Sequence, residues 1–392
     1  MIPAHESPMT AVDLFSGAGG FSLGLHSAGV DVVSAVEIDP NLASTYRRNF
    51  PNTNLLVRDI RSVTGQDLSG KNGIDLVVGG PPCQGFSIGG TRNPRDARNT
   101  LLTEFSRLVR EIGPKYFLME NVPGLLEKPF APALDALRKS LEAGGYCVFP
   151  PVVLNARDFG IPQERRRIFL LGTSVDSRRD DINPLANINV LDPIPTVWDA
   201  IKDLAFVSGE RHKESQSRYF KKTPEKISGY ARVLRLAEPP NGCAAPDHQI
   251  GCTILNHRVT AHSPQVIERF RGTARGTMEP ISRYYRLHPD REARTLRAGT
   301  GADHGSHTSP RPIHPYAPRC ITVREAARLH SFPDWFEFNE TTWHGFRQIG
   351  NAVPPQMAER IVRSVLVAPM GSVSSEDFGE NGIVSEEAPV VF

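Results

Sequence analysis

Cysteine is scarce in this sequence, with five among 392 residues, at positions 83, 147, 243, 252 and 320. No two of them form a C-x-x-C pair, so the set argues against a disulfide framework and indicates a reducing compartment. Long apolar runs are also missing, and none approaches the roughly 18 residues of a membrane helix. The first residues lack the basic-then-apolar pattern of a secretory signal. We therefore expect a protein of the cytosol or nucleoid with no membrane partner.

Net charge is small, at +2, but it is unevenly distributed along the chain. Residues 371–392 contain five acidic side chains and no lysine or arginine, and without them the net charge rises to +7. Residues 256–319 contain eleven arginines, five carboxylates and six of the twelve histidines. This basic segment indicates a polyanionic partner, with a solvated surface as the alternative. The acidic segment predicts a disordered tail that either maintains solubility or competes for the basic face.

Residues 10–172 alternate short apolar runs with helical patterns. The predicted strands are residues 11–15, 32–37, 74–78, 116–120 and 167–171, and the predicted helices are residues 21–27, 42–50, 103–112 and 131–143. This alternation is typical of an α/β fold with a Rossmann-like, doubly wound, mostly parallel sheet. We assign residues 1–172 to this unit, and the length of the chain suggests one further domain.

Regular periodicity stops after residue 172 and returns near residue 320. Residues 173–319 are rich in proline, glycine, asparagine, arginine and histidine, which predicts a smaller, irregular second domain. In residues 320–370, Thr322 and Glu325 form a capping box that opens a helix through His330. A last helix is predicted after Pro354 and Pro355, because proline is favoured at helix starts. Its apolar face consists of Met357, Ile361, Val362 and Val365.

Cys83 is the strongest candidate nucleophile. It lies in the segment G-G-P-P-C-Q-G-F-S, residues 79–87, directly after a predicted buried strand. Active sites of open α/β sheets lie at such strand ends. Two prolines fix the backbone before the cysteine, whereas Gly85, Gly89 and Gly90 favour a mobile lid after it. A structural or incidental thiol is the alternative.

A glycine-rich turn after the first predicted strand indicates a nucleoside site. In D-L-F-S-G-A-G-G-F-S-L-G-L, residues 13–25, a ligand can approach the backbone at Gly17, Gly19 and Gly20. Glu37 ends the next strand, where a carboxylate can hold ribose hydroxyls, and Asp59 can accept from the exocyclic amine of adenine. The pattern differs from G-x-G-x-x-G, which favours a cofactor without pyrophosphate, such as S-adenosylmethionine. Ordinary turn and capping roles are the alternative for each residue alone.

Two further polar segments lie at the predicted sheet edge that holds Cys83. E-N-V-P-G, residues 120–124, ends a strand, and Q-E-R-R-R, residues 163–167, leads into one. Glu120 is a candidate general acid with a raised pKa. Arg165 or Arg167 can stabilise negative charge on a substrate oxygen and can also favour a thiolate. A salt-bridged strand end is the alternative for the arginines.

These motifs, in this order and over nearly the whole chain, resemble the DNA cytosine-5 methyltransferases of the bacterial restriction-modification type. The last matching segment is Q-I-G-N-A-V-P-P, residues 348–355. The resemblance implies the fold of S-adenosylmethionine-dependent methyltransferases and assigns the cytosine to Cys83, Glu120, Arg165 and Arg167. It implies no metal. The cofactor site that it implies is formed by Phe15, Gly17, Gly19, Gly20, Glu37, Ile38, Asp59, Ile60, Pro82, Leu101, Asn351 and Val353.

The resemblance also implies a role for the second region. A base inside a duplex cannot reach a cysteine at a sheet edge, so the cytosine must flip out of the helix. Residues 173–319 correspond to the family's target-recognition domain, in which Thr295 and Leu296 resemble a short signature. Its arginines would contact phosphates and guanines. The implied partners are double-stranded DNA and a cognate restriction endonuclease that acts on the same site without a stable complex. The expected state is a monomer.

Three alternatives remain open from the sequence. One branch of the family methylates cytosine in RNA, although the large recognition region favours DNA. A non-catalytic DNA-binding regulator could keep the same fold, but the intact set of Cys83, Glu120 and Arg167 argues against it. A zinc site is the third alternative, and the spacing of its ligands matches no usual finger pattern. Those ligands would be Cys243, His248, Cys252 and His257.

Overall fold

The computed structural model describes residues 8–70, 73–82, 100–175, 183–188, 190–205, 217–219, 227–299 and 311–367. The predicted nucleophile, Cys83, and the predicted acidic tail, residues 371–392, lie outside these ranges. In the described part of the chain, no helix has both the length and the apolar character needed to span a membrane.

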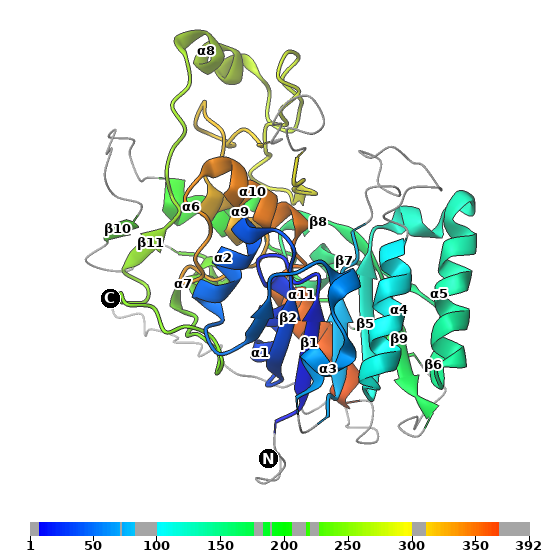
Figure 1. Ribbon diagram of the computed structural model, residues 1–392. Coiled ribbons are helices and arrows are strands. Elements are labelled where there is room, and N and C mark those ends of the chain that lie inside the picture. Colours follow the sequence, from blue (N-terminus) through cyan, green and yellow to red (C-terminus); the bar gives the residue numbers. More distant parts are fainter. Residues whose placement is uncertain are drawn as a thin grey trace, which may run out of the picture.

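A mostly parallel sheet forms the centre of the molecule (Figure 1). Its strands are β1 (Thr10–Leu14), β2 (Asp31–Val36), β3 (Asn54–Leu56), β4 (Leu76–Gly79), β5 (Tyr116–Asn121), β6 (Tyr146–Val148), β7 (Val152–Asn155) and β9 (Arg166–Ser174). They are ordered β3-β2-β1-β4-β5-β9-β6, with β7 also pairing with β9. The five strands from β3 to β5 run parallel, whereas β9 is antiparallel to β5, β6 and β7. The predicted fold class is confirmed.

Helices cover both faces of this sheet. They are α1 (Gly20–Ser27), α2 (Pro40–Asn49), α3 (Gly65–Ser69), α4 (Thr100–Ile112), α5 (Ala131–Ala143) and α11 (Pro355–Val367). One core joins α3, α4 and α5 to residues such as Val12 and Leu14 of β1, and the other joins α1 and α11 to Ala11 of the same strand. Alternate residues of β1 thus serve opposite cores. The predicted apolar face of α11 is confirmed, because all four of its residues are buried there.

The direction of β9 determines which residues meet at the edge of the sheet. Because β9 is antiparallel to β5, its first residues lie beside the last residues of β5. The register pairs Glu120 with Phe169 and Asn121 with Ile168. The start of the polar segment 120–124 therefore lies beside the end of the polar segment 163–167.

The remaining elements are short. They are β8 (Gln163–Glu164), α6 (Val197–Ala205), β10 (Ser217–Tyr219), α7 (Gly229–Leu236), β11 (Thr253–Leu255), α8 (Pro264–Gly272), β12 (Ala293–Arg294), α9 (Val323–Leu329) and α10 (Thr342–Asn351). Single 3-10 turns are Ile60–Ser62, Pro123–Leu126, Lys128–Phe130, Ala156–Phe159 and Pro184–Asn187. In Figure 1, α8 stands at the top of the molecule, on the side opposite the N-terminus. The predicted capping box of Thr322 and Glu325 is confirmed at the start of α9.

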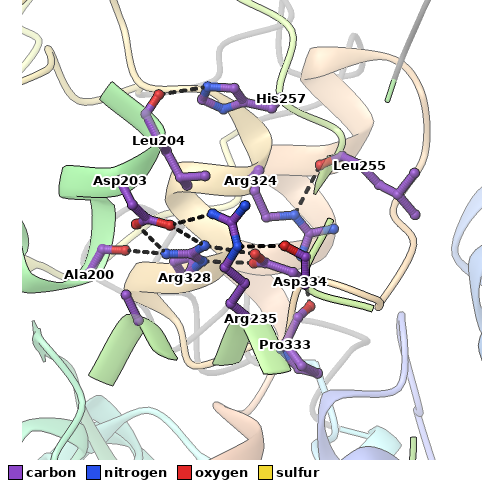
Figure 2. A network of polar contacts seen from close by, with 12 residues as sticks. Ala200, Asp203, Leu204, Arg235, Leu255, His257, Arg324, Arg328, Pro333 and Asp334 are labelled. Carbon is purple, nitrogen blue, oxygen red and sulfur yellow. Dashed lines mark hydrogen bonds and ion pairs between the residues drawn. The ribbon is translucent and has the colours of Figure 1, made fainter. Parts of the chain in front are cut away.

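A buried ionic network fixes α6 and α7 to α9 (Figure 2). Arg328 pairs with Asp203 at 2.8 Å and with Asp334 at 2.7 Å, and Arg235 pairs with the same Asp203 at 2.8 Å. Burial alone would raise the pKa of Asp203, but the guanidinium groups of Arg328 and Arg235 outweigh it and lower that pKa. Arg324 lies beside them and donates to three backbone carbonyls. Such buried charges favour one relative placement of these helices.

Candidate active site

The loop that carries Cys83 begins at the end of β4, at the carboxyl edge of the parallel strands. Pro81 is buried and Pro82 is exposed, and Pro82 is the last residue described before the cysteine. The side-chain amide of Asn121 donates to the carbonyl of Pro81 at 3.2 Å. The end of β5 therefore holds the start of this loop in place.

Glu120 and Arg167 form an ion pair at this edge. The Nε atom of Arg167 lies 2.8 Å from Oε1 of Glu120, and the side chains are 13% and 12% exposed. The other carboxylate oxygen points toward Gly80, where a Cβ atom would lie 3.3 Å away from it. The pair is thus close to the backbone that leads into the Cys83 loop, and it keeps some contact with solvent.

Arg165 has a different environment, although the sequence did not separate it from Arg167. It is 1% exposed, and its guanidinium donates to the carbonyls of Leu296, Gly350 and Ala352 at 3.2, 2.9 and 3.0 Å. These carbonyls belong to the segment after β12 and to the end of α10. Arg165 therefore ties the start of β9 to two distant segments, and Arg167 is the arginine that faces the acid.

A second buried cluster, formed by Gln163 and His330, contacts the same two segments, at Leu296 and Ala352. Gln163 receives the backbone N–H of Leu296 on its carbonyl oxygen and lies 2.9 Å from Nδ1 of His330. The other ring nitrogen of His330 lies 3.0 Å from the carbonyl of Ala352, which can only accept, so Nε2 carries the proton. Burial, with the charge of Arg165 nearby, lowers the pKa of His330 well below its usual range. His330 received no role from the sequence, because its partners are distant in the chain.

The predicted cofactor turn and Glu37 are in direct contact. The carboxylate of Glu37 accepts the backbone N–H of Gly17 at 2.9 Å and that of Asp39 at 2.8 Å. Burial raises the pKa of Glu37 despite these hydrogen bonds. Phe15 adopts a left-handed conformation with φ 60°, which turns the chain out of β1 into the glycine segment. The two strand ends that the sequence selected are joined by hydrogen bonds.

The three glycines of this turn meet different surroundings. A Cβ atom on Gly17 would enter open space, whereas one on Gly19 would lie 2.2 Å from the ring of Phe50. One on Gly20 would lie 2.4 Å from the carbonyl oxygen of Val353. Gly17 therefore leaves room for a ligand, and the other two allow close packing of the turn on its neighbours.

The other predicted cofactor residues differ in their exposure. Ile38, next to Glu37, is 61% exposed, which leaves an apolar surface beside the carboxylate. Asp59 caps a 3-10 turn, and hydrogen bonds from Arg61 lower its pKa. Ile60 is buried, Leu101 is half-buried on α4, and Asn351 is exposed at the end of α10. These positions stay predictions, and Gly17, Glu37 and Ile38 have the geometry that best fits a nucleoside.

Comparisons with known proteins identify the family. The model of the C-5 cytosine-specific DNA methylases matches residues 9–366. The chain belongs to this family. It is 42% identical to the type II methyltransferase M.XorII of Xanthomonas oryzae over 91% of this chain and 84% of that one, and 33% identical to M1.HphI of Haemophilus parahaemolyticus over 91% and 87%. It is a DNA cytosine-5 methyltransferase of the bacterial restriction-modification type.

Solved structures agree with this methyltransferase fold. A DNA modification methyltransferase encoded within an E. coli prophage is 35% identical, with a TM-score of 0.78 over 91% of this chain and 98% of that one. Dnmt2 of S. pombe is 18% identical, with a TM-score of 0.57 over 93% and 100%. At that identity the second likeness shows the fold alone.

One buried acid next to the glycine turn was not singled out from the sequence. Asp13, at the end of β1, is 1% exposed, and its carboxylate accepts the hydroxyl of Ser22 at 2.6 Å. Burial raises the pKa of Asp13 to about 7, although the hydrogen bonds from Ser22 act in the opposite direction. The leading position of Asp13 in the glycine motif was the available signal.

The residues of the zinc alternative have other partners. His257 is buried, with its ring nitrogens 2.8 Å from the hydroxyl of Thr322 and 3.1 Å from the carbonyl of Leu204. Cys243 packs against an apolar core, and burial raises the pKa of its thiol to about 12. Within the described ranges, no three His, Cys, Asp or Glu residues form a group that could hold a metal.

Proposed function

We propose that this enzyme transfers a methyl group from S-adenosylmethionine to carbon 5 of a cytosine flipped out of double-stranded DNA. The target lies within a short specific sequence, and the reaction passes through a covalent adduct with Cys83. The observation that supports this most directly is the pair of Glu120 and Arg167 at the strand edge from which the Cys83 loop begins. The glycine turn bound to Glu37 ends at the same edge of the sheet.

The acid and the arginine account for the first step. The Cys83 thiolate adds to carbon 6 of the cytosine, and the electron pair of the 5,6 double bond moves into the ring toward nitrogen 3. Glu120 donates a proton or a hydrogen bond to that nitrogen. Arg167 orients the carboxyl group and stabilises charge at the neighbouring carbonyl oxygen. Arg165, held by three backbone carbonyls, positions this strand and does not contact the base.

The residues of the cofactor turn suit a nucleoside without phosphates. Glu37 would hold the ribose, Ile38 would cover an apolar ring face, and Gly17 would leave space for close approach. S-adenosylmethionine, when bound, supplies an electrophilic methyl group. After methylation, loss of the proton from carbon 5 and departure of Cys83 restore the aromatic ring.

Residues 173–319 form the proposed target-recognition domain between catalytic segments 1–172 and 320–370. We infer that the enzyme acts as a monomer on DNA in the bacterial cytoplasm. We also infer that a cognate endonuclease cleaves the same unmethylated site without forming a stable complex with it. Cleavage by that endonuclease should stop once this enzyme has modified the site.

Bisulfite sequencing of plasmid DNA from cells that express the chain tests this proposal. Protected cytosines confined to one short motif of the DNA would support it. Transfer RNA from the same cells is sequenced in the same way, as the competing methyl acceptor. The variant Cys83→Ala should abolish methylation and still bind duplex DNA. Methylation by this variant would show that Cys83 is not the nucleophile, and protection in transfer RNA alone would favour the RNA alternative.

A further inference from the structure

A short hairpin follows α8, and the sequence analysis did not detect it. Its arms are joined by hydrogen bonds from the N–H of Arg286 to the carbonyl of Thr277, from Glu279 to Tyr284 and from Gly276 to Arg286, each 2.8 Å long. Met278 and Tyr285 form an antiparallel bridge within it. Residues 276–286, named here the recognition hairpin, thus form a two-stranded ribbon at the top of the molecule beside α8 (Figure 1).

The tip of the recognition hairpin is fixed by hydrogen bonds and exposes apolar side chains. The buried carboxylate of Glu279 accepts both the backbone N–H and the hydroxyl of Ser282. Arg283 closes the turn in a left-handed conformation with φ 59°. Ile281 at this tip is 70% exposed, the highest value among the large hydrophobic side chains of the described residues, and Met278 is 43% exposed. A turn that is fixed by hydrogen bonds and exposes apolar side chains is suited to contact with a partner.

The base of the hairpin is fixed to both α8 and the catalytic edge. Buried Arg286 donates to the carbonyls of Phe270, Arg271 and Thr273 at the end of α8. The guanidinium of Arg294, on β12, stacks on the ring of Tyr285 at 4.1 Å. The strand β12 pairs with β8, directly before the strand that carries Arg167. The hairpin is therefore linked through one ring contact to the edge that receives the cytosine.

Charge around the hairpin indicates a polyanion. Exposed arginines lie on it and on both sides of it, whereas the exposed acids are fewer. Arg275 is held over the ring of Tyr316 at 4.3 Å, with its Nε atom donating to the carbonyl of Pro315. Positive side chains around an apolar tip are suited to phosphates on both sides of a groove. The exposed arginines are Arg271, Arg275, Arg283, Arg291, Arg294 and Arg297.

We propose that the recognition hairpin enters the major groove of the DNA and that Ile281 reads the C5 methyl group of a thymine in the target sequence. This inference rests on the proposed function. The major groove accepts a two-stranded ribbon, and the thymine methyl is an apolar group that it displays. Neighbouring Arg283 and Arg275 then lie near the phosphates.

The test replaces each thymine of the wild-type target with uracil, which removes only the methyl group. We expect kcat/KM of the wild type to fall about fourfold at one position, the effect of one buried methyl-sized group. The variant Ile281→Ala should methylate the thymine and uracil duplexes equally. Val233→Ala, which truncates another exposed side chain on α7, should keep the wild-type preference. Circular dichroism would confirm that both variants are folded.

The outcomes separate this inference from the proposed function. Equal rates of the wild type on thymine and uracil duplexes, a target without thymine, or an unchanged preference in Ile281→Ala would each overturn the role of Ile281. In these cases wild-type methylation of cytosine would still support the proposed function. Absence of cytosine methylation by the folded wild type would instead contradict the proposed function itself.

Discussion

Arg167 contacts Glu120 across the sheet, with 2.8 Å between Nε and Oε1, because β9 runs antiparallel to β5. Phe169 lies opposite Glu120 in the register, and Arg167 is two residues before it, on the same face of β9. A parallel strand at this position would have placed the arginine at the other end of the sheet. The pairing of this acid with this arginine is therefore a product of sheet topology.

Replacing Glu120 with glutamine should reduce catalysis. The amide keeps the shape but cannot donate a proton to the ring nitrogen, so kcat should fall about a hundredfold or more. Binding of target duplex should change little. Single-turnover methyl transfer and DNA titration would measure both quantities. Glu142→Gln, which alters an exposed carboxylate on α5, is the matched control, and a normal kcat for Glu120→Gln would remove the acid from the mechanism.

Arg165, between β8 and β9, and Arg167, on β9, should respond differently to substitution. Arg165→Met removes the guanidinium that donates to three buried carbonyls, of which that of Ala352 keeps His330 as a donor, and this should lower the free energy of unfolding by about 3 kcal/mol. Arg167→Met should cost less stability, because Glu120 keeps 12% of its surface exposed, and should mainly reduce kcat. Urea denaturation of both variants, with kinetics of the folded protein, tests this. A larger loss of stability in Arg167→Met and a larger loss of kcat in Arg165→Met would instead favour a direct role of Arg165 at the cytosine.

Glu37→Gln should weaken cofactor binding. Both carboxylate oxygens accept backbone N–H groups, and the amide of glutamine would turn a donor toward one of them. In the proposed complex the carboxylate also accepts from the ribose hydroxyls, and loss of that charged hydrogen bond corresponds to a fall in affinity of about tenfold or more. Calorimetric titration with S-adenosylhomocysteine measures it. Asp135→Asn on α5 should bind like the wild type, and unchanged affinity in Glu37→Gln would place the ribose elsewhere.

The sequence predicted the sheet well because its central strands are apolar runs between clear turn residues. Even there, β3, β6 and β7 were missing from the predicted strands, since strands of three and four residues leave little periodicity. The sequence assigned Glu120 and Arg167 to the same sheet edge, but their contact depends on the antiparallel direction of β9, which strand ends alone do not specify. The different environments of Arg165 and Arg167 did not, because burial of Arg165 depends on carbonyls more than one hundred residues away.

The irregular region was predictable only in outline. His257, for example, was considered as a zinc ligand, whereas the structure places it between Thr322 and Leu204. Its partners come from segments 65 and 53 residues away, and no local pattern connects them. The same applies to the network around Arg328. Polar contacts of this kind are specified by tertiary packing, which local propensity does not report.

Asp203→Asn should destabilise the enzyme through that network. The neutral amide leaves buried Arg328 and Arg235 with less negative charge, and removing one partner of a buried ion pair costs about 3–5 kcal/mol. Thermal and urea denaturation would measure the loss. Asp247→Asn, at a side chain that is 97% exposed, should have little effect. Equal stability of the two variants would mean that the network adds nothing to folding.

Stability should also decrease at mildly acidic pH because of His314. Burial lowers its pKa to about 4, and its Nδ1 atom accepts the backbone N–H groups of Tyr316 and Ala317. The unfolded chain, with a histidine pKa near 6.5, therefore binds the proton first as the pH falls. The free energy of unfolding should drop by about 2 kcal/mol between pH 7.5 and pH 5 from this group, and above pH 7.5 it contributes no dependence.

A non-titrating replacement isolates this contribution. In His314→Asn, the side-chain carbonyl can accept the same backbone N–H groups without binding a proton, so the slope of stability against pH should flatten between pH 7 and pH 5. His330, whose pKa is also lowered, would still contribute part of the dependence of stability on pH. Urea denaturation at each pH provides the measurement, with His344→Asn on α10 as the control. If His314→Asn keeps the full wild-type slope, another group controls the acid sensitivity, and the buried imidazole of His314 is not the proton acceptor on unfolding.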